Sequence, residues 1–203
     1  MKINPNCYYS ILNRKPLQQV PKELIYTLKA VATDFTTGKS RIVNVHNMAD
    51  TATGHYVGQM VTQARKKVDC TYIYPNKITC DALEIIRLIM EERRMGYGSK
   101  FIEFAKHESR KKGCEGRVFA LASRLYDRNH PSHIFYRKKG FTSVNPKINK
   151  ILDECIEQGK DLDIEYADNL FMYLPVKEKP SKVSRVFQKI KNFIKNLFNH
   201  NVH

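Results

Sequence analysis

The stretch that decides the fold is LEIIRLIMEERRMGYG, residues 83–98. Its first half, residues 83–90, is apolar except for two charges, which predicts a strand largely buried in a sheet. Its second half carries Gly96 and Gly98, and the amphipathic helix predicted behind it ends at Gly113. A strand that runs through a glycine-containing loop into a helix can hold phosphates, because the helix N-terminus offers unpaired N–H groups and a partial positive charge.

Strands are predicted to dominate the chain before this stretch, and helices alternate with strands behind it. The segments with strand-like composition are 24–31, 41–45, 55–61 and a further short candidate at 70–74. The elements predicted behind the stretch are a strand at 118–122, a short helix at 131–139, an amphipathic helix at 147–163 and a terminal strand at 168–176. This order is typical of an α/β arrangement.

Three features in this region occur together in one protein family. Residues 93–98, RRMGYG, match the pattern R/Q-x-x-G-x-G/A, and residues 84–90, EIIRLIM, are similar to the strand E-L-x-x-L-x-V that precedes it. The downstream pattern N-x-x-A-x-x-x-Y-x-x-x-G-F is matched, with Ser in place of Ala, by Asn129, Ser132, Tyr136, Gly140 and Phe141. On these residues the chain resembles the GCN5-related N-acetyltransferase (GNAT) family. The resemblance covers residues 83–141, and residues 170–174 look like the family's final strand.

The chain departs from the family pattern in two places. The loop between Met90 and Arg93 is shorter than the commonest form and lacks its usual Pro. The two helices that normally follow the first strand and shape the acceptor site are not visible, and strands are predicted in their place. The resemblance therefore supports the cofactor half of the site, leaves the acceptor half open and does not name the acceptor.

The resemblance implies an α/β fold with a GNAT-like mixed, mostly antiparallel sheet flanked by helices. We expect an acetyltransferase domain at residues 1–176. A basic amphipathic tail at residues 177–203 is predicted to add a C-terminal helix.

The resemblance also implies the reaction, which is transfer of an acetyl group from acetyl-CoA to a primary amine by direct attack in a ternary complex, without a metal. Tyr136 stands where the family places the tyrosine that protonates the departing thiolate, and Glu84 where some members keep a general base. A packed aromatic at Tyr136 and a solvent-facing carboxylate at Glu84 are the structural alternatives. His130 and His133 flank the same short helix and are predicted to be surface histidines.

The family pattern places the cofactor as well. The pyrophosphate is expected on backbone N–H groups of the glycine loop. The pantetheine arm is expected beside the strand end, where one free N–H polarises the thioester carbonyl. The implied cofactor-binding residues are Ile89, Met90, Arg93, Arg94, Met95, Gly96, Tyr97, Gly98, Ser99 and Asn129. Asn129 could instead only cap the short helix.

The charge of the chain leaves two other classes of function open. The formal net charge is +15 and the pI about 9.6, with basic clusters at 65–67, 110–112 and 137–139. A nucleic-acid-binding protein would show such a charge, but no RNA- or DNA-binding motif is visible and the clusters lie near predicted element ends. The other alternative is a GNAT-fold module that binds acyl-CoA without catalysis. No segment has the roughly 20 apolar residues of a membrane span, and a cytoplasmic protein is expected.

The tail predicts a basic amphipathic helix over residues 181–198. Its apolar positions are Val183, Val186, Phe187, Ile190, Phe193, Ile194, Leu197 and Phe198. Two outcomes stay open. The apolar face packs on the domain or on a second subunit, since dimers are frequent in the family, or it docks on an anionic membrane surface, which would place the protein peripherally on the inner membrane surface.

Overall fold

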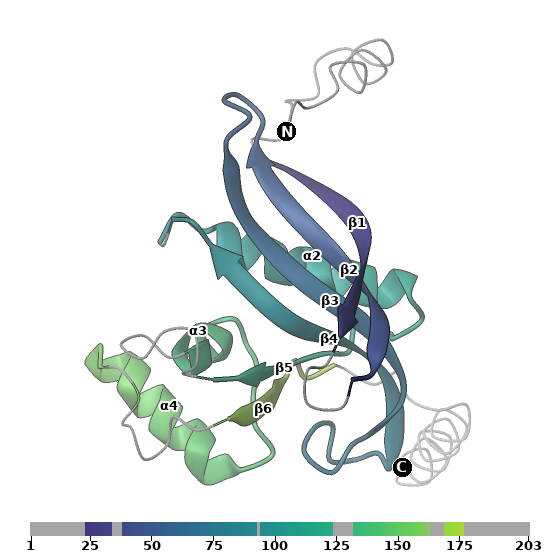
Figure 1. The fold of residues 1–203 in the computed structure, drawn as a ribbon. Helices are drawn as coiled ribbons and strands as arrows, with labels where there is room; N and C mark the ends of the chain where they lie inside the picture. The colour runs from purple at the N-terminus through teal and green to yellow at the C-terminus, as the bar shows by residue number, and fades with distance from the viewer. Residues whose placement is uncertain are drawn as a thin grey trace, which may run out of the picture.

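The computed structural model describes residues 23–33, 38–92, 94–123, 132–160, 162 and 169–176. The elements, in chain order, are β1 (Glu23–Thr33), β2 (Ser40–Asp50), β3 (Tyr56–Asp69), β4 (Thr79–Met90), α2 (Tyr97–Lys111), β5 (Val118–Ala122), α3 (Ser132–Lys138), α4 (Pro146–Gln158) and β6 (Leu170–Tyr173). Figure 1 shows four long strands side by side with α2 behind them, and α3 and α4 next to the short strands β5 and β6.

The six strands lie in the sheet in chain order, β1 to β6. All neighbours are antiparallel except β4 and β5, which run parallel because α2 carries the chain back between them. The predicted fold class is therefore confirmed for the described residues, which form a mixed, mostly antiparallel sheet with three helices. The predicted tail helix at 181–198 and the boundary at 176/177 lie outside the described residues.

The strand candidate at 70–74 is wrong. These residues form turns, and Tyr74 has a left-handed backbone with φ of 49°. Of the side chains that suggested a strand, those of Cys70, Ile73 and Tyr74 are buried and that of Tyr72 is exposed. The Tyr74 hydroxyl donates a hydrogen bond to the carbonyl of Val118 at 3.0 Å. The segment thus covers the start of β5 rather than pairing in the sheet.

The sheet separates two hydrophobic cores. The larger core lies under α2, which buries Phe101, Ile102 and Ala105 against strand residues such as Leu83 and Ile85. The smaller core gathers Cys70, Ile73, Tyr74, Cys80, Ala82, Phe119 and Tyr173. None of the described helices is long and apolar enough to cross a membrane.

A buried histidine joins the first three strands. His46 on β2 lies with its Nδ1 2.7 Å from the hydroxyl of Thr27 on β1 and its Nε2 2.8 Å from the hydroxyl of Thr62 on β3. Its ring meets that of Phe104 on α2 edge to face, at 4.9 Å between centroids. Burial lowers the pKa of His46 to about 4, an effect that Glu108 partly offsets and Lys112 adds to.

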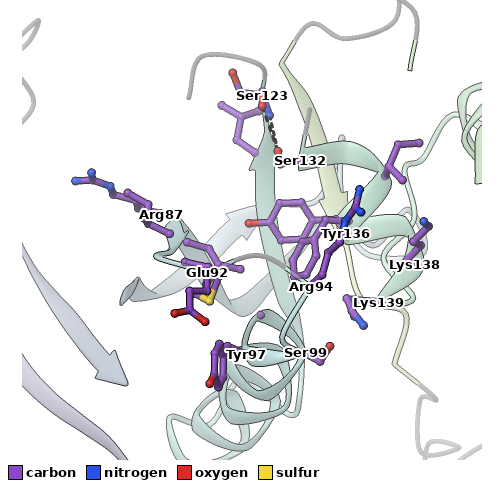
Figure 2. Close-up of a pocket in the computed structure, with 18 of the residues that line it drawn as sticks. Arg87, Glu92, Arg94, Tyr97, Ser99, Ser123, Ser132, Tyr136, Lys138 and Lys139 are labelled. Carbon is purple, nitrogen blue, oxygen red and sulfur yellow. Dashed lines mark hydrogen bonds between the residues drawn. The ribbon is translucent and has the colours of Figure 1, made fainter. Parts of the chain in front are cut away.

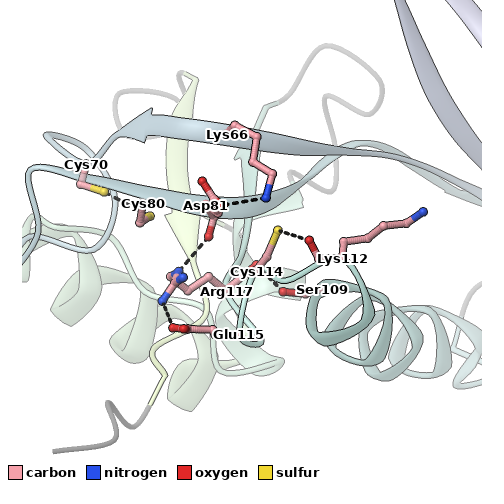
Figure 3. A network of polar contacts seen from close by, with 9 residues as sticks. All are labelled: Lys66, Cys70, Cys80, Asp81, Ser109, Lys112, Cys114, Glu115 and Arg117. Carbon is pink, nitrogen blue, oxygen red and sulfur yellow. Dashed lines mark hydrogen bonds and ion pairs between the residues drawn. The ribbon is translucent and has the colours of Figure 1, made fainter. Parts of the chain in front are cut away.

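A polar network fixes the point where β5 joins β4 (Figure 3). The Asp81 carboxylate accepts hydrogen bonds from Lys66 Nζ at 2.7 Å and from the backbone N–H of Lys67 at 3.0 Å. Arg117 donates from Nε to the Asp81 carbonyl at 2.8 Å and from its guanidinium to Glu115 at 2.6 Å. The residues before β5 are thereby tied to the start of β4, which sets where the two strands begin to run together.

Candidate active site

Strand β4 leaves β5 halfway along its length. The two strands pair only from Leu83 to Ile85, opposite Val118 to Ala120. A register shift between β3 and β4 leaves Ile86 as an extra residue, and such a bulge bends the strand. Beyond it, residues 87–90 still pair with β3, so their other backbone edge is directed away from any described strand. The structure therefore gives residues 86–90 the open edge that the resemblance implied for Ile89 and Met90.

A pocket of about 740 Å³ lies along this edge, within the size range of small-molecule and cofactor sites. Residues 86–90 and the loop before α2 form one wall, and the end of β5 with α3 forms the other (Figure 2). Its charged lining residues are Arg87, Glu92, Arg94, Lys138 and Lys139. Four cations against one carboxylate favour an anionic ligand.

The glycine loop presents an open helix N-terminus to this pocket. Gly96 is the N-cap of α2, with φ of 83°, and no side chain caps the helix or places an acid in its first turn. Ser99 N–H donates to the Gly96 carbonyl at 3.0 Å and is thus used within the helix. The N–H groups of Tyr97 and Gly98, the two residues before Ser99, have no helical acceptor and are the donors suited to an anion.

The two glycines of the loop are required for different reasons. A side chain at Gly96 would meet nothing within 4 Å, but its left-handed backbone is costly for any other residue. A Cβ at Gly98 would lie 2.9 Å from Cε2 of Phe135, so this glycine lets α3 approach α2. The close approach brings the tyrosine that follows Phe135 to the pocket.

Helix α3 carries that tyrosine. Its first residue, Ser132, is tied to the end of β5, accepting from Ser123 N–H at 3.1 Å and donating to the Ser123 carbonyl at 3.2 Å. This pair accounts for a serine where the family pattern has alanine. At the other end of α3, Arg137 donates to both carboxylate oxygens of Asp153 on α4, at 2.7 and 2.6 Å.

Tyr136 is held by packing and directed into the pocket. Its ring contacts those of Phe135 and Phe141, with centroids 5.3 and 5.0 Å apart. Figure 2 shows its hydroxyl directed toward Arg87 on β4 and toward Glu92, which follows that strand. Burial raises the pKa of Tyr136, so its hydroxyl stays protonated at neutral pH and can act as a proton donor.

The structure does not bring Glu84 to the pocket. Its carboxylate pairs with Arg65 at 3.1 Å and with Arg41 at 3.7 Å, on the neighbouring strands β3 and β2. Pocket lining by β4 begins two residues later, at Ile86. The geometry thus favours the alternative, an ion-pair partner within the sheet, over the general base predicted at this position.

Most of the other predicted site residues line the pocket. Arg94, Gly96, Tyr97, Gly98 and Ser99 line the pocket with the strand end, while Met95 is exposed beside it. Arg93, Asn129 and His130 lie outside the described residues. His133, predicted at the surface, is fully buried, which corrects that prediction, and no group of three possible metal-binding side chains gathers among the described residues.

Sequence reasoning missed part of the pocket wall. The lining residues not predicted as site residues are Ile86, Arg87, Leu88, Glu92, Leu121, Ser123, Ser132, Ile134, Phe135, Lys138 and Lys139. The helical period of α3 was the available signal, because Phe135, Lys138 and Lys139 lie one turn or less from Tyr136. The sequence pattern indicates the two lysines only as part of a basic cluster.

Comparison with known protein families identifies the class of protein to which this domain belongs. The model of the acetyltransferase (GNAT) family matches residues 51–141. These residues are therefore a GNAT-family acetyltransferase domain, which confirms the resemblance drawn from residues 83–141. No curated protein sequence matches the chain.

The solved structures to which the chain is similar include one that is described as a member of this family. A tyrosine-to-phenylalanine mutant of KacT is 11% identical, with 66% of this chain and 71% of that chain covered and a TM-score of 0.42. A protein described as a GnaT-family acetyltransferase from Bordetella pertussis is 16% identical, with 66% of each chain covered and a TM-score of 0.37. A bacterial toxin is 11% identical, with 74% of this chain and 91% of that chain covered and a TM-score of 0.39.

Proposed function

We propose that this protein is an N-acetyltransferase that transfers the acetyl group of acetyl-CoA to a primary amine by direct attack in a ternary complex. The observation that carries the proposal is the Tyr136 hydroxyl, directed into a pocket between the open edge of β4 and the end of β5. The family domain at residues 51–141 supports the same class of reaction.

The lining residues suit acetyl-CoA by their chemistry. The α2 N-terminus at Gly96, together with Arg94 and Lys139, would hold the phosphates by charge and backbone N–H donors. The edge of residues 86–90 on which no described strand pairs would bind the pantetheine arm through main-chain hydrogen bonds, as a strand would be bound. Bound there, acetyl-CoA supplies the activated acyl group as a thioester.

Tyr136 would act as the general acid. An alkyl amine with a pKa of about 10.4 is mostly protonated at pH 7, so freeing its lone pair costs roughly 4–5 kcal/mol. As the amine nitrogen bonds to the acyl carbon, the carbon–sulfur bond breaks and the thiolate takes the Tyr136 proton. The proton of the amine leaves to water in this proposal, since the Glu84 carboxylate is engaged with Arg65 and Arg41.

The structure weakens the nucleic-acid alternative. In the cluster at residues 65–67, Arg65 pairs with Glu84 and Lys66 with Asp81. In the cluster at 137–139, Arg137 pairs with Asp153, while the two lysines line the pocket. These positive charges are used within the domain and at an anion-favouring pocket.

Release of free thiol from acetyl-CoA, followed over a panel of primary amines, tests the function. Thiol release with at least one amine is expected, and Tyr136→Phe should reduce it. Saturable acetyl-CoA binding without thiol release on any amine would support the non-catalytic module instead. Salt-dependent binding of generic RNA without acetyl-CoA binding would support the nucleic-acid binder.

A further inference from the structure

Strand β1 is a long edge strand. All eleven of its residues pair with β2, from Glu23 opposite Asp50 to Thr33 opposite Ser40, and no described strand pairs with its other side (Figure 1). None of its residues is buried. Strands usually have about 5–6 residues, and a long exposed edge presents a row of backbone donors and acceptors on which another strand can pair.

The side chains of β1 make this edge apolar on one face. Leu24, Tyr26 and Leu28 share a face, because alternate residues of a strand point the same way, and their side chains are 49%, 42% and 51% exposed. The intervening residues face α2, where Ile25 packs on the larger core and Thr27 meets His46. Large apolar side chains lined up at an exposed edge mark an interaction surface.

We propose that β1 is a homodimer interface, in which it pairs antiparallel with β1 of a second copy about a two-fold axis at Tyr26. Such an interface requires a strand that is complementary to itself. In this register Leu24 faces the partner's Leu28, and Glu23 faces the partner's Lys29, each pair occurring twice. Cross-strand apolar and opposite-charge pairs stabilise antiparallel strands.

The charges of β1 select this register. Its only charged residues are Glu23 and Lys29. With the axis at Leu28, Lys29 would face the partner's Thr27 and Glu23 the partner's Thr33, so both charge pairs would be lost. Glu23 already pairs with Lys100 on α2, so in the dimer its carboxylate would be shared between Lys100 and the partner's Lys29.

The first test measures the assembly of the full chain by sedimentation velocity over a concentration series. A dimer is expected, and Tyr26→Lys should weaken it at least about tenfold, because two lysines would face each other at the axis. Ile42→Lys is the matched control, since Ile42 is 67% exposed but lies on the inner strand β2. A wild-type monomer at every concentration, or a Tyr26→Lys dimer of unchanged affinity, would overturn the proposal.

The second test measures the register by cysteine cross-linking in a Cys7→Ser background. Under copper–phenanthroline oxidation, Tyr26→Cys should form a covalent dimer across the axis, and Leu28→Cys should not. Cross-linking through Leu28→Cys alone would contradict the axis at Tyr26. A dimer that neither variant cross-links would show that the β1 edge is not the interface. It would point to contacts through the tail, or to a segment of the same chain that pairs with β1.

The proposed dimer interface does not depend on the proposed acetyltransferase activity. The pocket lies at the β4–β5 junction, with β2 and β3 between it and the edge. Acetyl-CoA binding measured on Tyr26→Lys should match the wild type, which also shows that the variant is folded.

Discussion

Tyr136 supplies the proton donor of the proposed reaction. Its ring is fixed between Phe135 and Phe141, and its burial keeps the hydroxyl protonated. We predict that Tyr136→Phe lowers kcat by about 10²-fold, the low end of general-acid effects, because the proton is needed only as the carbon–sulfur bond breaks. Acetyl-CoA affinity should hardly change.

Steady-state kinetics paired with acetyl-CoA titration checks this prediction. Tyr74→Phe is the control, because Tyr74 is also a buried tyrosine but donates to Val118 in the smaller core. That variant should lose stability and keep kcat. An unchanged kcat in Tyr136→Phe would remove Tyr136 from the mechanism and point to water as the acid.

Gly96 and Gly98 should respond differently to alanine. Gly96→Ala is expected to destabilise the fold by roughly 1–2 kcal/mol, the cost of a left-handed backbone. No clash adds to this cost, because no atom lies within 4 Å of the added Cβ. Gly98→Ala should destabilise by about 1–3 kcal/mol through overpacking against Phe135. Thermal unfolding of both variants in Phe135→Leu backgrounds separates the causes, because only the Gly98→Ala effect should shrink. Equal rescue of both would contradict the two distinct roles.

At this scale the sequence predicts residues whose spacing carries the chemistry and misses those whose role depends on distant neighbours. The predicted positions of Tyr136, Gly96 and Gly98 at the pocket agree with the structure, because each depends on spacing within one helical turn or one loop. The ion pairs of Glu84 could not be predicted, because Arg41 and Arg65 approach it only once β2 is paired with β3 and β3 with β4.

The first three strands depend on the buried His46. Its pKa in the folded protein, about 4, lies below the ordinary value of 6.5, so the unfolded chain takes up a proton first. The stabilisation is fully present above about pH 6.5 and is lost as the pH falls toward 4, with a total on the order of 3 kcal/mol. We predict that the free energy of unfolding decreases over this pH range.

Urea unfolding at several pH values between about 7 and 4 measures the effect. His46→Gln should be less stable at neutral pH and should lose most of the pH dependence of this window. His55→Gln, at an exposed histidine, is the control and should keep it. A pH profile of His46→Gln parallel to that of the wild type would show that other groups carry the dependence.

Elements are predictable where one period dominates. The helix after the glycine loop and the strand before it follow from their hydrophobic patterns, and α4 follows from its apolar spacing. The structure adds the cap of α4, Asn145, whose side chain accepts from Lys147 N–H at 3.0 Å. The candidate at 70–74 failed because Tyr72, Ile73 and Tyr74 have strand-like composition, whereas the turn is stabilised by burial against β5. Tertiary packing overrides local propensity there.

At the scale of the whole molecule, we propose that the tail, residues 177–203, docks reversibly on anionic membranes through the predicted helix at 181–198. Phe and Leu side chains would enter the interface, and each lysine would add on the order of 1 kcal/mol. Co-sedimentation with vesicles containing phosphatidylserine should retain the full chain and release a 1–178 truncation. Equal partitioning of both, or none by either, would favour packing of the tail on the domain or a second subunit.

The overall topology was only partly predictable. The mixed sheet follows from the family resemblance, and the parallel pairing of β4 with β5 follows from the helix between them. The acceptor half could not be derived, because long strands occupy the positions where the family places two helices and no described helix covers the corresponding sheet face (Figure 1).

Acetyl-CoA binding in the pocket between β4 and β5 is the central claim, and calorimetric titration of the full chain tests it most directly. We predict one saturable site per chain in the wild type, and none in a Gly96→Val, Gly98→Val double variant shown by circular dichroism to be folded, because branched side chains would distort the helix N-terminus that holds the phosphates. Absence of saturable binding to the wild type, or undiminished affinity in the folded double variant, would contradict the account.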